Sequence, residues 1–173
     1  MPSLATTTIR PETRLDRIVH MIDPVLDIEN RHTGEKILVR YHGVTGYRMD
    51  AIRRINWIMR DWRQESLSQV DPRLLWALSA IRMAAMRDGN PGKILLLSGY
   101  RTAETNAYLR SRGVRAAYNS LHLQARAADI VIPGTDLAHV SDYARWLQVG
   151  GVGTYRRSGF THIDSGRERS WGG

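Results

Sequence analysis

The chain has 173 residues, of which 42% are apolar and 24% are charged, so it is long enough to bury one hydrophobic core and has the composition of an ordinary globular domain. It contains no cysteine, which excludes disulfide bonds and thiolate ligands and leaves histidine, aspartate and glutamate for any metal site. A net charge of +8 favours polyanionic partners, and no apolar run is long enough to span a membrane.

The first half of the chain predicts an arm followed by helices. Residues 1–22 are rich in threonine, arginine and proline and show no signal peptide, so we expect a flexible N-terminal arm before a single domain over residues 23–173. Residues 37–41 predict a strand, and apolar residues at helical spacing predict a helix over residues 50–64. A second helix is expected to begin at Asp71-Pro72, with Asp71 as its cap.

The second half of the chain brings most of the predicted strands. Residues 94–97 predict a buried strand, and a short helix over residues 103–112 ends at a glycine. A buried strand over residues 127–132, a helix over residues 137–147 and a hairpin of two strands, 152–155 and 160–164, complete the chain. This order favours an α+β domain with a central, mostly antiparallel sheet and helices packed on one side.

An acidic residue, Asp129, interrupts the apolar run 127–132. An ionised carboxylate in a buried strand is costly unless a cation or several donors hold it. His122 lies seven residues upstream in a loop, and the two-residue period of the strand 160–164 places His162 and Asp164 on one face. His122, Asp129 and His162 therefore match the two-histidine, one-carboxylate ligand set of a catalytic zinc site, which keeps one position for water.

Two further residues are assigned roles in hydrolysis. Zinc lowers the pKa of its bound water to about 7, and the reaction then requires a base and a cationic donor for the developing oxyanion. We assign Asp164 to the first role and Arg101, which follows the strand 94–97, to the second. Taken singly, each residue has a simpler interpretation: His122 as a loop histidine, Asp129 in a structural ion pair, His162 with Asp164 as a surface pair, and Arg101 as a solvated charge.

The segment SLHLQARAADI, residues 120–130, resembles the S-x-H-x-x-G-x-A-x-D signature of the zinc D-Ala-D-Ala peptidases, whose superfamily also contains the hedgehog signalling domain. The chain is more closely similar to the YcbK-like, or murein endopeptidase K, family in four ordered blocks: residues 59–63, 98–110, 120–130 and 150–171. Two departures stand out. Ala125 replaces the signature glycine, and we expect its methyl group to be tolerated, with a narrower approach to the metal as the alternative. No glutamate stands just before His162, where some superfamily members carry their catalytic acid.

The resemblance implies a zinc-dependent peptidase of the hedgehog and D-Ala-D-Ala peptidase fold that hydrolyses an amide in peptidoglycan stem peptides or cross-links. One zinc ion per chain would be held by His122, Asp129 and His162. The expected protein is a monomer with no nucleic-acid partner, and the family places it in the periplasm or at the cell wall. The bond that is cut stays open.

The resemblance also implies the surroundings of the metal. Arg101 would contact the substrate carboxylate or the oxyanion. Independently of the resemblance, we expect Tyr100, Asn106 and Ser120 to support the substrate site, the last two through hydrogen bonds that orient the ligands. The missing glutamate leaves Asp164 as the base, with a role as an additional metal ligand as the alternative.

Two other functions remain as rivals. In the first, the zinc is structural and the domain is a non-catalytic module that binds cell-wall peptides or a protein; a D-Ala-D-Ala-type carboxypeptidase is the nearest enzymatic alternative. In the second, the charge of +8 belongs to a nucleic-acid-binding domain, which leaves the buried Asp129 unexplained.

Overall fold

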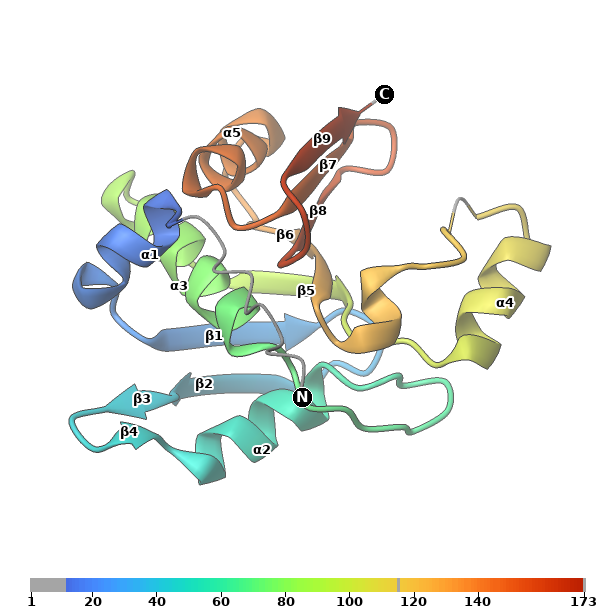
Figure 1. Ribbon diagram of the computed structural model, residues 1–173, viewed down its shortest axis with the longest axis horizontal. Coiled ribbons are helices and arrows are strands. Elements are labelled where there is room, and N and C mark those ends of the chain that lie inside the picture. Colours follow the sequence, from blue (N-terminus) through green and yellow to red (C-terminus); the bar gives the residue numbers. More distant parts are fainter. Residues whose placement is uncertain (1–11, 115, 173) are drawn as a thin grey trace, which may run out of the picture.

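A seven-stranded sheet with the strand order β2-β1-β5-β6-β8-β7-β9 forms the centre of the protein (Figure 1). The structure, a computed structural model, describes residues 12–114 and 116–172. The strand pairs are antiparallel except for β1 with β5 and β7 with β9, which confirms the α+β class and the mostly antiparallel sheet. The strands are β1 (Val25–Asn30), β2 (Lys36–Arg40), β5 (Ile94–Ser98), β6 (Ala127–Val131), β7 (Gly151–Tyr155), β8 (Phe160–Asp164) and β9 (Arg169–Gly172). A small separate hairpin joins β3 (His42–Gly43) and β4 (Gly46–Tyr47).

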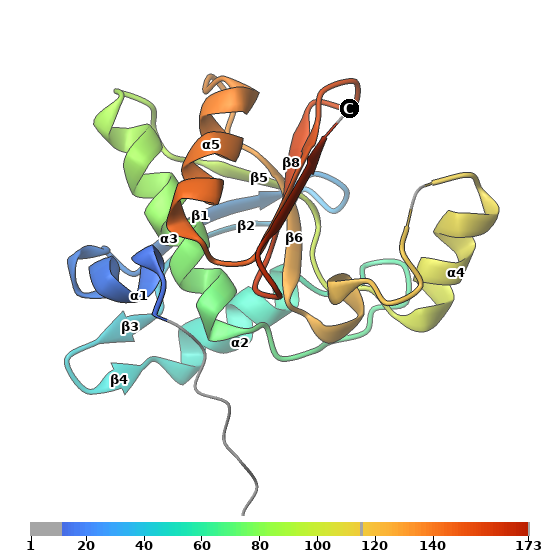
Figure 2. The same cartoon turned by 45° about the horizontal axis from the view of Figure 1, so that its top comes forward.

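The long helices cover one face of this sheet. Figure 2 shows α3 (Pro72–Arg87) and α5 (Leu137–Leu147) side by side against the strands, and α2 (Met49–Ile58) packs on β1 and β2. Alternate residues of the strands point into this helical layer, among them Ile28 of β1 and Ile130 of β6, which are fully buried. In both views α4 (Ala103–Ser111) projects from the body of the molecule. In the described residues no helix is both long and apolar enough to cross a bilayer.

Helix α3 forms as its sequence predicts. The Asp71 carboxylate accepts a hydrogen bond of 2.9 Å from the main-chain N–H of Arg73, and Pro72 occupies the first turn, where its missing N–H costs nothing. Leu75 and Leu78 repeat at helical spacing and are buried against the sheet. Helix α3 packs on β1 and on α5, and α5 in turn packs on β7 and on β8, one of the strands that carry the site.

Helix α2 is shorter than its sequence predicts, because it ends at Ile58 and not at residue 64. The carbonyl oxygen of Ile58 accepts a hydrogen bond of 2.9 Å from the Asn30 side chain, and that of Met59 accepts one of 2.8 Å from the main-chain N–H of Tyr100. The last carbonyl groups of the helix are thus satisfied by other segments and not by a further turn. This contact ties the end of α2 to the loop after β5.

The predicted arm includes a short helix. Residues 1–11 lie outside the described residues. Residues 12–22 contain α1 (Arg14–Ile18) and η1 (Val19–Met21), and Leu15 is buried. The prediction of a flexible arm as far as residue 22 is therefore wrong for residues 12–22. Thr13 and Asp16 form a capping box, and Asp16 also pairs with Arg73 of α3. Burial opposes ionisation here, but hydrogen bonds from Thr13 and Arg73 lower the pKa of Asp16 to about 2.

Candidate metal centre

Five residues in register cross the sheet in one row and define the position of the site. Ser98 of β5 pairs with Asp129 of β6, Asp129 pairs with His162 of β8, His162 pairs with Gly153 of β7, and Gly153 pairs with Trp171 of β9. Side chains of paired residues lie on the same face of a sheet. The row therefore places Asp129 and His162 next to each other, although 33 residues separate them in the chain.

The site lies on the sheet face opposite α3 and α5. Ala128 and Ile130 of β6 belong to the hydrophobic core, so Asp129, which lies between them, faces the other way. On β8, Thr161 hydrogen-bonds Ser141 of α5, whereas His162 faces the site. Strand β6 is thus buried on both faces, by apolar packing on one face and by polar contacts on the other. This explains why the carboxylate of Asp129 lies within an apolar run.

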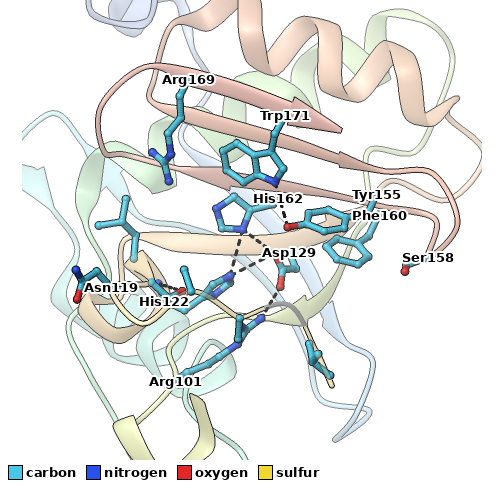
Figure 3. A pocket seen from close by; sticks show the side chains of 15 residues that line it. Arg101, Asn119, His122, Asp129, Tyr155, Ser158, Phe160, His162, Arg169 and Trp171 are labelled. Atoms are coloured by element: carbon cyan, nitrogen blue, oxygen red, sulfur yellow. Dashed lines mark hydrogen bonds and ion pairs between the residues drawn. The ribbon is translucent and has the colours of Figure 1, made fainter. Parts of the chain in front are cut away.

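Three ligand atoms converge at this point (Figure 3). Asp129 Oδ1 lies 2.8 Å from His162 Nδ1 and 3.2 Å from His122 Nε2, and the two nitrogen atoms are 3.2 Å apart. All three side chains are buried. The structure therefore brings together the three residues that the sequence selects as metal ligands.

The loop after β5 fixes the orientation of His122. This residue lies in η2 (Leu121–Gln124), whose N-cap Ser120 accepts the main-chain N–H of His122. The carbonyl oxygen of Gly99 lies 2.6 Å from His122 Nδ1, and the carbonyl oxygen of His122 accepts the N–H of Arg101 at 3.0 Å. Because a carbonyl oxygen only accepts, Nδ1 carries the hydrogen and Nε2 presents its lone pair to the site.

Asp164 fixes the orientation of His162 from behind. Its Oδ2 lies 3.1 Å from His162 Nε2, and its Oδ1 accepts the main-chain N–H groups of Gly151 and Gly166, each at 2.9 Å. Arg169 also binds this fully buried carboxylate. Burial alone would raise the pKa of Asp164, but the hydrogen bonds from His162 and the main chain hold it below its ordinary value. The ionised carboxylate accepts the Nε2 hydrogen of His162, which leaves Nδ1 free as a ligand atom.

The resulting arrangement fits a metal cation. Two nitrogen lone pairs and an ionised carboxylate face one another at 2.8–3.2 Å, which is unfavourable unless a proton or a cation lies among them. Burial would lower the pKa of His162, but hydrogen bonds to Asp129 and Asp164 raise it. Burial lowers the pKa of His122, and although burial would raise that of Asp129, the neighbouring His122 keeps it well below the ordinary value.

Arg101 closes the side of the site next to β5. Its Nη2 donates a hydrogen bond of 2.6 Å to Asp129 Oδ2, the oxygen atom that does not face the histidines, and its Nε donates one of 2.7 Å to Ser98 Oγ. The guanidinium lines the pocket and is mostly buried. Arg101 therefore orients the carboxylate ligand and also presents a cation to the pocket.

The other predicted site residues lie in different places. Ser120 lines the pocket, whereas the Tyr100 side chain packs against the core and Asn106 is buried on α4, where its Nδ2 donates to the carbonyl oxygen of Ala117. The carboxylate of Asp164 lies on the far edge of the His162 ring and not among the converging atoms. This position does not support a role for Asp164 as base or as additional ligand.

Ala125 shows why the signature has glycine at its position. The residue is buried and adopts the left-handed conformation, with φ of 53° and ψ of 34°, at the end of η2. The left-handed conformation costs an L-residue about 1 kcal/mol of conformational free energy, whereas it costs glycine little. The departure therefore acts through the backbone of the turn that carries His122, and not through a methyl group near the metal.

Sequence reasoning missed the contribution of β9 and β7. Arg169 and Trp171 of β9 line the pocket, as does Tyr155 at the end of β7. A Cβ atom at Gly151 would lie 2.5 Å from Asp164 Oδ2, and one at Gly153 would lie 2.5 Å from the Trp171 ring. The alternating glycines of GVGTY were the available signal, because a strand that lacks side chains on one face leaves room for those of its neighbours.

The metal centre opens into a pocket of about 580 Å³. Its walls come from the loop between α4 and η2 on one side and from β7, β8 and β9 on the other. This volume is in the range of pockets that bind small molecules or short peptide segments. Three protein ligands beside an open pocket are the arrangement of a catalytic metal site and not of a closed structural one.

The fold and the site together are those of a metallopeptidase. A family model described as peptidoglycan L,D-endopeptidase MepK, one of the M15 peptidases, matches residues 22–171, and the chain belongs to this family. Peptidoglycan L,D-endopeptidase MepK of Escherichia coli strain K12 is 35% identical over 147 residues, which are 85% of this chain and 79% of that protein. The probable peptidoglycan L,D-endopeptidase MepK of Haemophilus influenzae is 33% identical over 150 residues, 86% of this chain and 79% of that protein. No solved structure gives a significant match.

Proposed function

We propose that this protein is a zinc-dependent endopeptidase that hydrolyses an L,D-amide in the peptide cross-links of peptidoglycan. The observation that carries the proposal is the convergence of His122 Nε2, Asp129 Oδ1 and His162 Nδ1 beside an open pocket. The names of the relatives support the L,D-bond and the polymer. Peptidoglycan lies outside the inner membrane, so we place the activity in the periplasm or at the cell wall.

Zinc suits the donor set, because it accepts imidazole nitrogen together with carboxylate oxygen and keeps a position for a further ligand. When bound, zinc supplies a Lewis acid for the peptide carbonyl group and lowers the pKa of a water molecule. The chain fixes the ligands beforehand: Gly99 orients His122, Asp164 orients His162, and Arg101 orients Asp129. Such outer hydrogen bonds set both the affinity for the metal and the geometry of the site.

We assign Asp164 as a positioning residue. It contacts the far nitrogen of His162 and has no surface in the pocket, so it acts on the reaction through the ligand. Arg101 keeps the role that the sequence suggests. Two of its five N–H groups hold Ser98 and Asp129, and the guanidinium lines the pocket, where it faces a substrate carboxylate or the developing oxyanion.

The proposal is tested by metal analysis together with the digestion of purified cross-linked peptidoglycan. We expect one zinc ion per chain and the release of un-cross-linked muropeptides, whose masses identify the amide that is cut. His122→Ala should lose both zinc and cleavage. His139→Ala, at an exposed position on α5, is the matched control and should retain both.

Other outcomes separate the rivals. One zinc ion per chain without cleavage of any muropeptide would favour the non-catalytic binding module. Release of a terminal D-alanine alone would favour the carboxypeptidase. A chain that binds no zinc at its metal centre, or a His122→Ala variant that still cleaves, would refute the proposed site.

A further inference from the structure

Three aromatic side chains form one wall of the pocket beside the metal centre: Tyr155 at the end of β7, Phe160 at the start of β8 and Trp171 of β9. We call them the aromatic wall. The rings of Tyr155 and Phe160, which are register partners, stack at 4.4 Å with an angle of 12° between their planes. The Trp171 ring lies 5.2 Å from the ring of His162. The wall thus extends from the turn between β7 and β8 to the metal ligand.

Gly153 makes this wall possible. It lies between His162 and Trp171 in the row that crosses the sheet, and a Cβ atom there would lie within 2.5–2.8 Å of three atoms of the indole ring. The missing side chain allows the Trp171 ring to lie over the backbone of β7 and to reach the edge of His162. The position of the indole is therefore set by the sheet and not by an exposed loop.

Trp171 also fixes the hydrogen bonding of Tyr155. Its Nε1 donates a hydrogen bond of 3.1 Å to the Tyr155 hydroxyl oxygen. An indole N–H is a donor only, so the hydroxyl accepts there and keeps its own hydrogen for another partner. The stack with Phe160 limits rotation of the Tyr155 ring, and Figure 3 shows the hydroxyl group turned toward the side of the pocket where His162 and Asp129 lie.

Several other polar groups line the pocket, among them Asn119, Ser120 and Arg169, and the Tyr155 hydroxyl differs from them in the ring stack and the Trp171 hydrogen bond that hold it. Among the described residues that line the pocket, Asp129 is the only carboxylate, and both of its oxygen atoms are engaged. The Ser120 hydroxyl oxygen accepts the N–H of His122 at 3.4 Å and, like that of Tyr155, keeps its own hydrogen, whereas Ser158 lies beyond the aromatic wall in Figure 3. In the same view Arg101 lies below the converging ligand atoms and Tyr155 lies to their right.

We propose that Tyr155 is a catalytic residue that donates a hydrogen bond to the carbonyl oxygen of the scissile amide as this oxygen becomes an oxyanion. The inference rests on the proposed peptidase function and adds a second donor beside Arg101. Tyr155 keeps its proton throughout, so the role is electrostatic and no bond to this side chain forms or breaks. Such preorganised donors favour the transition state over the bound substrate.

The test compares Tyr155→Phe with the wild-type protein on one defined cross-linked muropeptide. Removing one donor to an oxyanion lowers kcat by about 100- to 1,000-fold, and KM should change by no more than about threefold. A phosphinate analogue, in which a tetrahedral phosphorus replaces the scissile carbonyl carbon, should lose affinity by a similar factor in calorimetry. The affinity for the cleaved peptide product should be unchanged, as should the zinc content.

Two further variants separate this role from a structural one. Tyr143→Phe, on α5, is the matched control and should behave as the wild type. Trp171→Phe removes the N–H that orients the hydroxyl and should lower kcat in the wild-type background, but not further in Tyr155→Phe.

The possible failures are distinguishable. If the wild type cleaves the muropeptide and Tyr155→Phe has the same kcat, the inference is wrong and the proposed function stands. Equal losses of affinity for product and phosphinate would also overturn it, because they indicate a role in ground-state binding. A wild-type protein that binds zinc and cleaves no muropeptide would remove the proposed function itself and the inference with it.

Discussion

Replacing Asp164 by asparagine tests whether this residue positions His162 or takes part in proton transfer. The main-chain N–H groups of Gly151 and Gly166 both point at Oδ1 and cannot become acceptors, so the asparagine oxygen must occupy that position. Its NH₂ group then faces His162 Nε2. To accept this hydrogen bond, His162 must move its hydrogen to Nδ1, the atom that faces Asp129. The same NH₂ group also replaces the oxygen that accepts a hydrogen bond from Arg169 Nη2, so the variant blocks one ligand atom and removes this ion pair as well.

The expected loss follows from this change. Removing the partner of a metal-binding histidine typically lowers metal affinity by about 10- to 100-fold, or about 1.4–2.7 kcal/mol. The assay is zinc competition with a chromophoric chelator, followed by kinetics at saturating zinc. We expect weaker zinc binding and a kcat that recovers in large part once the site is filled. Asp142→Asn, at an exposed position on α5, is the matched control.

The result that would refute this reasoning is specific. If Asp164→Asn binds zinc as the wild type does, and its kcat at saturating zinc is still lowered by about 100-fold or more, the carboxylate acts in proton transfer. Asp164 would then be a catalytic residue and not a positioning residue that acts through His162.

Two further predictions concern stability. Gly99→Ala places a Cβ atom 2.4 Å from the carbonyl oxygen of Met59 and should lower the free energy of unfolding by about 1–3 kcal/mol in urea titrations. Gly43→Ala is the control, because a Cβ atom there meets no atom within 4 Å. Equal stabilities of the two variants would contradict the close approach at Gly99. Asp16→Asn should cost about 1 kcal/mol at pH 7, because the pKa of Asp16 is lowered to about 2 and solvent screening reduces the gain at this partly exposed pair. Because the pKa of Asp16 is lower in the folded state, its carboxylate stabilises the fold fully above the unfolded pKa of 3.8. The difference in stability between the wild type and Asp16→Asn should therefore shrink as the pH falls toward 2. A stability difference that does not change with pH would contradict this prediction.

The convergence of the three candidate ligands was predictable because its signals are local and strong. Asp129 is anomalous in an apolar strand, and the alternation on β8 places His162 on one face without knowledge of the fold. Helix α3 was predictable from the Asp71-Pro72 start. In each case short-range chemistry and tertiary structure favour the same conformation.

The missed elements depend on partners far along the chain. The alternation of Leu26 and Ile28 predicts β1 only weakly, and β9 becomes a strand because it pairs with β7. Helix α2 ends at Ile58, whose carbonyl oxygen accepts a hydrogen bond from the Asn30 side chain, and the spacing of apolar residues does not reveal this contact. The role of Asp164 likewise required knowing which nitrogen of His162 faces Asp129.

Strand β9 lies at the edge of the sheet, whereas β6 and β8, which carry two of the candidate metal ligands, lie inside it, so the two regions differ in local stability. In the described part of the chain this strand pairs with β7 alone, and all four of its residues are exposed. Edge segments with one ladder open at a lower free energy than the core. Because the ligands come from η2, β6 and β8, opening of β9 leaves them in place while Trp171 leaves His162 and Arg169 leaves Asp164. Opening of β9 would therefore disturb the aromatic wall and the contact between Arg169 and Asp164 before it disturbs the strands that carry the candidate ligands.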